Sequence, residues 1–124
     1  MIVKNNKRGG ESGFAIYVNA AHPLVRRRFT IAHEIAHYIL HENLIGDGIA
    51  EDALLRAGLS NAVERQANAM AADILMPWHL IKDLQENGIE TIDGLATILQ
   101  VSKDAMSYRL LGVPYQEAQA YGHA

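Results

Sequence analysis

Two histidines and a glutamate in one short segment have the types and spacing to hold and use a metal ion. His33 and His37 stand four residues apart, with Glu34 beside the first of them. On a helix this spacing places both imidazole rings on one face, one turn apart, where they can share a metal. Glu34 is offset around the helix, so its carboxylate can reach a metal-bound water rather than the metal. This HExxH arrangement supplies two zinc ligands and a general base for attack on a carbonyl group.

The same five residues also have a simpler interpretation. A short pattern can arise by chance, and an amphipathic helix can carry two histidines on its solvent face. The surroundings favour a metal, because apolar residues flank the motif and place both rings near the core boundary, where a buried polar group needs a partner. The chain has no cysteine, so any metal site must be built from His, Asp or Glu.

A catalytic zinc normally has three protein ligands and one open position, so a third ligand is needed. His41 follows one turn after His37, but three successive turns of a straight helix rise too far to converge on bonds of about 2 Å. We therefore expect His41 at the surface or beside a ligand. Glu64 lies 27 residues beyond His37, which leaves room for a second helix to return alongside the first. Asn68, four residues later on the same face, could orient a ligand histidine through its other ring nitrogen. Glu64 could instead close a capping box with Asn61 as the N-cap, and spacing alone does not decide between these roles.

The elements that must position these side chains are two long helices. From Leu24 onward, apolar residues recur at steps of three and four, which predicts a helix that starts at Pro23 and ends near Glu42–Asn43. A second helix is predicted over residues 62–76, because Pro77 cannot continue it. The two candidate ligand groups would then come from different helices.

Shorter elements are predicted around this pair. The segment Phe14–Val18 is β-branched and aromatic, which predicts a strand that we expect to pair with Ile2–Val3 as a hairpin. The fold class expected is therefore α+β, with a small antiparallel sheet packed against the HExxH helix and the Glu-bearing helix, and a helical C-terminal part. The other predicted segments are a loop over 43–60 with one short helix at 51–56, and helices over 77–85, 91–99 and 103–111, the last capped by Ser102.

The bulk composition limits the kind of protein. With 124 residues, 49% of them hydrophobic, the chain can form one domain with its own core. We expect a catalytic core over 1–90, a helical packing module over 91–113 and a tail over 114–124. The start of the chain lacks the apolar run of a signal peptide, and no apolar stretch approaches the ~20 residues that cross a bilayer. A soluble cytoplasmic protein without a membrane partner is the expectation.

Nucleic-acid binding is not expected. The net charge of −3 provides no overall attraction to phosphates. The basic run Arg26–Arg28 is interpreted as a solvated helix face. Residues 95–111 could form a helix-turn-helix, but Lys103 and Arg109 are accompanied by acidic neighbours, and a helix that reads DNA should carry more groups for bases and phosphates. We interpret this segment as a packing module or partner surface.

Three segments resemble, in order, the motifs of the ImmA/IrrE family of metallopeptidases. Residues 28–41, RFTIAHEIAHYILH, are similar to that family's RFTxAHExGHxxxH. Residues 64–77, ERQANAMAADILMP, are similar to its ExxANxFAAxLLMP, and residues 95–110 to its LAxxFxVSxxAMxxRL. The match covers most of the chain. Among the departures from the pattern, Ala36 replaces the usual glycine and Met70 the usual phenylalanine.

The resemblance implies a zinc ion held by His33, His37 and Glu64, with Glu34 as the catalytic base. It thereby favours the ligand role of Glu64 over the capping role. It also implies a zincin-like endopeptidase of narrow specificity. The implied substrate is a helix-turn-helix repressor or an antitoxin, encoded as a separate protein.

Other features of a peptidase stay open at this level. The strand over 14–18 could be a sheet edge that binds substrate backbone, as in zincin-like proteases, or an ordinary core strand. The alternative function is a zinc-stabilised module that binds its partner, as in toxin–antitoxin pairs, without cutting it. Glu34 argues against this alternative, because a purely structural site needs no general base. A residue that stabilises the oxyanion is expected, and the candidates by side-chain type are Tyr38, His41, His22 and His79.

Overall fold

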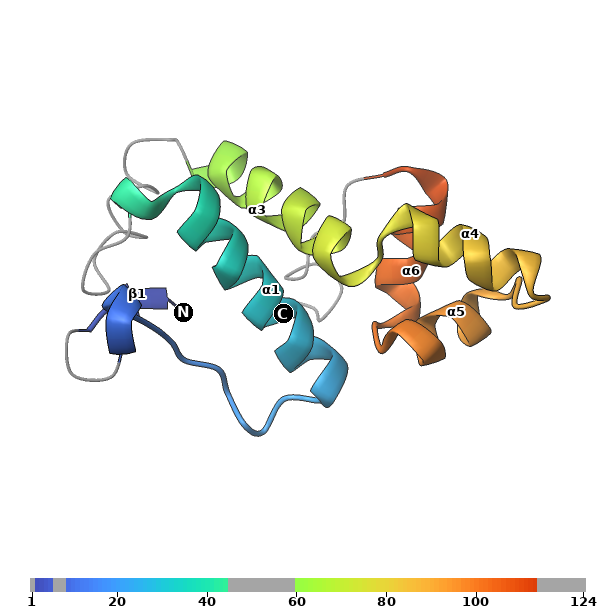
Figure 1. Ribbon diagram of the computed structural model, residues 1–124, viewed down its shortest axis with the longest axis horizontal. Coiled ribbons are helices and arrows are strands. Elements are labelled where there is room, and N and C mark those ends of the chain that lie inside the picture. The colour runs from blue at the N-terminus through green and yellow to red at the C-terminus, as the bar shows by residue number, and fades with distance from the viewer. Residues whose placement is uncertain (1, 6–8, 45–59, 114–124) are drawn as a thin grey trace.

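The computed structural model describes residues 2–5, 9–44 and 60–113, most of them helical (Figure 1). Two long helices, α1 (Leu24–Leu40) and α3 (Ser60–Leu75), lie side by side and run in opposite directions. Small side chains suit this close pairing, because Ala36 on α1 and Ala67 and Ala71 on α3 are all fully buried. An alanine in place of the expected glycine at position 36 is therefore accommodated within the packed interior.

A two-stranded antiparallel sheet completes the α+β class predicted from the sequence. Strands β1 (Ile2–Lys4) and β2 (Phe14–Ile16) pair with Val3 opposite Ala15. The sheet packs against α1, where the Phe14 ring meets the Tyr38 ring edge to face, with centroids 4.9 Å apart. The strand predicted over 14–18 is shorter than expected, and the exposed residues Tyr17 and Val18 lie beyond its end.

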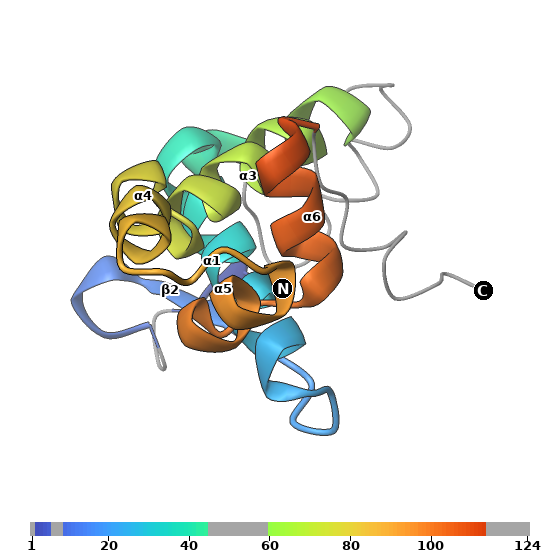
Figure 2. The same cartoon turned by 90° about the vertical axis from the view of Figure 1, so that its right-hand side faces the viewer.

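Three short helices form the C-terminal part: α4 (Trp78–Glu86), α5 (Ile92–Leu99) and α6 (Lys103–Leu111) (Figure 2). Their starts follow the sequence signals. The Ser102 hydroxyl accepts a hydrogen bond from the Ala105 N–H at 3.0 Å, as predicted, and Thr91 caps α5 in the same way. The core that joins these helices to α1 and α3 contains Phe29, Ala32, Ala71, Ala72, Met76, Ile81, Leu95, Ala96, Val101, Ala105 and Met106.

Two arginines form hydrogen bonds between the C-terminal part and the segment that contains the long helices. The Arg28 guanidinium on α1 donates to the carbonyl oxygens of Gln100 (3.1 Å) and Leu99 (3.5 Å), at the C-terminal end of α5, where a cation is favoured. Arg109 on α6 donates to the Met76 carbonyl at 3.0 Å and pairs with Asp73 at 3.0 Å. These bonds link α5 to α1, and α6 to the segment at the end of α3.

Two of the helix boundaries that differ from the sequence prediction bear on the candidate site. Helix α1 ends at Leu40 rather than near 42–43, because His41 leaves the helical conformation (φ −132°) and serves as its C-cap. Helix α3 begins at Ser60, so Asn61 lies inside its first turn instead of capping it. The capping-box position predicted for Glu64 therefore does not exist. The short helix predicted over 51–56 and the tail over 114–124 lie outside the described residues. Among the helices that the structure describes, none is long and apolar enough to span a membrane.

Candidate metal centre

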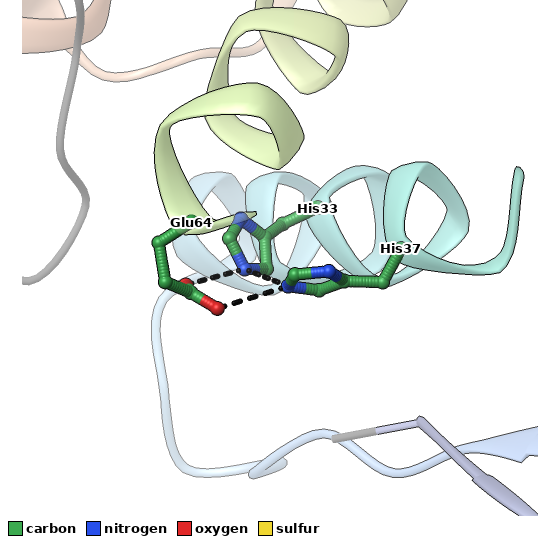
Figure 3. Close-up of side chains that lie close together, drawn as sticks. All are labelled: His33, His37 and Glu64. Atoms are coloured by element: carbon green, nitrogen blue, oxygen red, sulfur yellow. Dashed lines mark hydrogen bonds and ion pairs between the residues drawn. The ribbon is translucent and has the colours of Figure 1, made fainter. Parts of the chain in front are cut away.

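Three side chains from the two long helices converge at one point (Figure 3). The Nε2 atom of His33 lies 3.0 Å from Oε2 of Glu64, and Nε2 of His37 lies 3.0 Å from Oε1 of the same carboxylate. The two Nε2 atoms are 3.0 Å apart. The four-residue spacing on α1 aligns the imidazoles, and the antiparallel helix α3 brings the carboxylate to them.

This donor set fits a zinc ion. In a tetrahedral site with bonds of ~2.0–2.1 Å, ligand atoms are about 3.3 Å apart, close to the separations found here. One ligand atom from each residue lies within 4.8 Å of the other two. Two imidazole nitrogens at such short range repel each other unless a proton or a cation lies between them. Two imidazoles and one carboxylate also match a ligand set of catalytic zinc.

Asn68 orients one of the two imidazoles. It lies one turn beyond Glu64 on α3, and its Oδ1 atom is 2.8 Å from Nδ1 of His33. An amide oxygen only accepts, so His33 donates through Nδ1–H, and in its neutral form its Nε2 lone pair faces the centre. The structure thus brings together the four residues that the sequence analysis grouped. Their roles in metal binding stay predictions.

The remaining residue of the motif, Glu34, is buried, with 6% of its surface exposed. It follows His33 directly on α1, and its charge is one of the causes that raise the pKa of that histidine. A carboxylate can accept a proton and release it again, which is the chemistry of a general base. Its role as general base stays a prediction.

The charges of the cluster depend on one another. Burial lowers the pKa of His33, but the hydrogen bond and charge of Glu64, the charge of Glu34 and the bond to Asn68 together raise it above its ordinary value of 6.5. Burial raises the pKa of Glu64, but the hydrogen bonds and charges of His33 and His37 hold it far below its ordinary value of 4.5. Without a metal, the site therefore favours a protonated imidazole beside an ionised carboxylate, and a metal would replace that proton.

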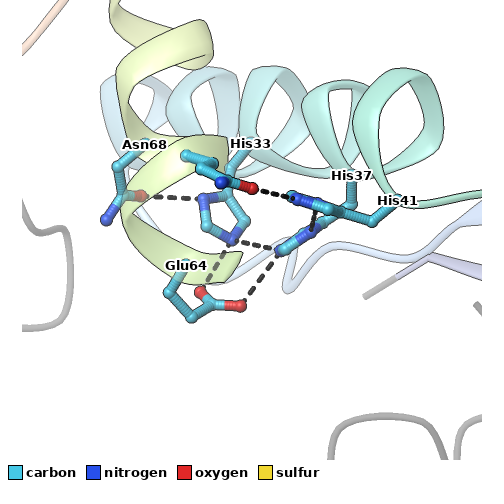
Figure 4. A network of polar contacts seen from close by, with 6 residues as sticks. His33, His37, His41, Glu64 and Asn68 are labelled. Carbon is cyan, nitrogen blue, oxygen red and sulfur yellow. Dashed lines mark hydrogen bonds and ion pairs between the residues drawn. The ribbon is translucent and has the colours of Figure 1, made fainter. Parts of the chain in front are cut away.

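His41 lies behind the cluster and not in it (Figure 4). Its Nδ1 atom is 3.1 Å from Nδ1 of His37, on the side of that ring turned away from Glu64. Its Nε2 atom is 2.7 Å from Oε1 of Gln66. Sequence reasoning placed His41 at the surface or beside a ligand, and it is buried beside His37, with 7% exposed. Gln66 was missed, because a glutamine two residues after Glu64 carries no signal of a metal site.

The other candidates for oxyanion stabilisation make contacts elsewhere. The His22 ring lies 3.3 Å from the Asn19 amide nitrogen. Tyr38 packs on Phe14 of β2, and His79 is exposed on α4. None of these contacts involves the three clustered side chains.

Comparison with known proteins gives two matches. A peptidase family model, described as the IrrE N-terminal-like domain, matches residues 6–111. The radiation response metalloprotease IrrE of Deinococcus radiodurans is 34% identical over 103 residues, which make up 82% of this chain. The matched region is 31% of that relative, so the chain spans about a third of its length. No solved structure gives a significant match.

Proposed function

The chain belongs to the IrrE N-terminal-like family of peptidases, and we propose that it is itself a zinc-dependent endopeptidase. The observation that carries the proposal is the convergence of the Nε2 atoms of His33 and His37 on the carboxylate of Glu64. A structural metal site needs only ligands. Here the residue between the ligands in the motif is a buried carboxylate, Glu34, which supplies the base that hydrolysis requires.

In this proposal His33, His37 and Glu64 hold the zinc ion. When bound there, the ion would polarise the peptide carbonyl and activate water as a nucleophile at neutral pH. Glu34 takes the proton of the attacking water and later passes it to the leaving amine. Asn68 keeps His33 in the form whose Nε2 lone pair faces the centre.

We further propose a protein substrate, specifically a helix-turn-helix repressor or an antitoxin made as a separate chain in the cytoplasm. The three ordered motifs of the sequence support this class of substrate. A protein is also favoured over nucleic acid because the two cations of α6 are engaged, Lys103 with Asp93 at 3.3 Å and Arg109 with Asp73. Arg109 lies in addition over the Trp78 ring, 4.7 Å from its centroid.

Strand β2 is the expected place for the substrate backbone. Within the described residues the sheet has two strands, with β2 paired to β1, and α1 covers one face. An extended peptide could add to an edge of such a sheet through backbone hydrogen bonds. The Phe14–Tyr38 contact ties β2 to the residue that follows His37, so a peptide on this strand would lie near the metal centre.

The test uses the zinc-loaded chain and the purified helix-turn-helix protein encoded beside its gene. Wild type should cut this protein, whereas Glu34→Gln should retain zinc and bind the protein without cutting it. Glu86→Gln, the same change at an exposed position of α4, is the matched control and should cut normally. Cleavage by Glu34→Gln would refute the role of Glu34. Binding without cleavage by wild type would identify a binding module instead of an enzyme.

A further inference from the structure

His41 and Gln66 form a chain of hydrogen bonds that starts at His37 and that the proposed hydrolysis does not use. His41 lies between His37 and Gln66, with Nδ1 3.1 Å from the first and Nε2 2.7 Å from the Oε1 atom of the second. His41 is buried, so water does not readily replace either contact. Both of its ring nitrogens are thus committed to protein partners.

The hydrogen bonds of this chain have a direction. The Gln66 amide oxygen only accepts, so Nε2 of His41 carries the proton and donates. A neutral imidazole holds one proton, so Nδ1 of His41 is bare and must accept. The atom that faces it is Nδ1 of His37, which therefore carries a proton and donates. When a metal replaces the proton that His37 shares with Glu64, the remaining proton of His37 is thereby kept on Nδ1, and its Nε2 lone pair is free for the metal.

The opposite direction would disable the centre. If an N–H group donated from position 66 to Nε2 of His41, then His41 would donate from Nδ1 to Nδ1 of His37. His37 would then carry its proton on Nε2, where it would point into the cluster in place of a metal. The group at position 66 thus decides, through His41, where His37 carries its proton. An acceptor there leaves Nε2 of His37 free for a metal, and a donor there places a proton on that atom.

We propose that Gln66 and His41 are positioning residues that hold His37 in its Nδ1–H form and so keep its Nε2 lone pair available to the metal. For His33, a direct hydrogen bond to Asn68 likewise keeps a proton on Nδ1. The proposal rests on the metal site of the proposed function but not on peptide hydrolysis. Metal binding therefore tests it separately from activity.

The first test is zinc affinity, measured by competition with a chromophoric chelator in a series at position 66. Gln66 is exposed, so these variants are expected to fold. Gln66→Glu is an acceptor and should bind at least as tightly as wild type. Gln66→Met should bind zinc about 10-fold more weakly than wild type. Gln66→Lys, which presents a donor, should bind zinc more weakly still, within the 10–100-fold loss typical of groups that orient ligands. Repeating the series at high salt removes the contribution of added charge, and the order should persist.

The second test reads the protons directly. The ¹⁵N shifts of the imidazoles in the zinc-loaded protein should show His41 protonated on Nε2 in wild type and in Gln66→Glu. His41→Leu should weaken zinc binding 10–100-fold, whereas His79→Leu on α4 should leave it unchanged. A proton on Nδ1 of His41, or equal affinities across the position-66 series, would overturn the proposal. A wild type that binds no zinc would overturn the metal site as well.

Discussion

The Asn68 amide oxygen lies 2.8 Å from Nδ1 of His33, one helical turn along α3 from the carboxylate that meets the Nε2 atom of the same ring. One face of α3 therefore contacts both nitrogens of a single imidazole. This contact fixes the rotation of the His33 ring as well as the site of its proton. It also provides the first of four predictions.

Replacing Asn68 should weaken zinc binding without removing a ligand. Asn68→Leu deletes the acceptor of the His33 Nδ1–H group, and we expect a 10–100-fold loss of zinc affinity. Asn68→Asp retains an acceptor and should bind at least as well as wild type. Chelator competition measures both. Equal weakening by the two variants would mean that the shape of the side chain matters and its hydrogen bond does not.

Glu64 should be required for metal retention. Wild type purified and reloaded with zinc should contain about one ion per chain by elemental analysis, as expected for one three-ligand site. Glu64→Ala removes one ligand of three and should lose the ion or hold it far more weakly. Glu86→Ala, at an exposed position, is the matched control. Full zinc occupancy of Glu64→Ala would show that the third ligand lies elsewhere.

The metal-free protein should gain stability from the cluster in a limited pH range. Although burial opposes it, pairing with the histidines depresses the pKa of Glu64, so its contribution is present above about pH 4.5 and is lost as the pH falls through its lower folded value. The pKa of His33 is raised, so its contribution is complete below about pH 6.5 and is lost as the pH rises through its higher folded value. The stabilisation should therefore be largest between these limits.

Thermal unfolding in a chelator, with Glu64→Gln beside wild type, measures this effect. The difference in Tm between the two proteins should be greatest between about pH 4.5 and 6.5 and should shrink at higher pH. The Glu64 side chain is 44% exposed, so screening by solvent keeps the difference in Tm small. A difference that does not vary with pH would contradict the predicted charges.

Arg109 should contribute to stability through its hydrogen bond to the Met76 carbonyl more than through its ion pair. The arginine side chain is 13% exposed, whereas its partner Asp73 is 69% exposed. Arg109→Met should lower the free energy of unfolding by about 1.5–3 kcal/mol, the range for a hydrogen bond with a charged donor. Asp73→Asn should cost less than about 1 kcal/mol. Urea unfolding of the zinc-free protein compares them, and equal losses would assign the effect to the ion pair.

The parts of the site that follow from local periodicity could be predicted from the sequence. A four-residue step on a helix places His33 and His37 together whatever the rest of the chain does. The same step relates Glu64 to Asn68 on the second helix. The α+β class and the cap of α6 at Ser102 likewise depend on short-range signals, and both are confirmed.

The parts that depend on where helices end could not be predicted. The four-residue step from His37 to His41 brings their rings together, but the sequence predicted that α1 continues to 42–43, whereas His41 is already its C-cap. The contact with Gln66 further requires the relative position of α1 and α3, which is set by buried alanines and the core packing of both helices. Helix ends are decided by small differences in free energy among neighbouring residues, so a sequence pattern locates them only approximately.

The three candidate ligands come from two helices, so a bound metal would link parts of the chain that are distant in sequence. A zinc ion bound by His37 and Glu64 would close a ring of chain between residues 27 positions apart, as a covalent cross-link does. Such a closure restricts the unfolded chain and makes binding energy part of folding energy. A metal-free copy would then unfold more readily than a zinc-loaded one and would be exposed to proteolysis for a larger fraction of its time.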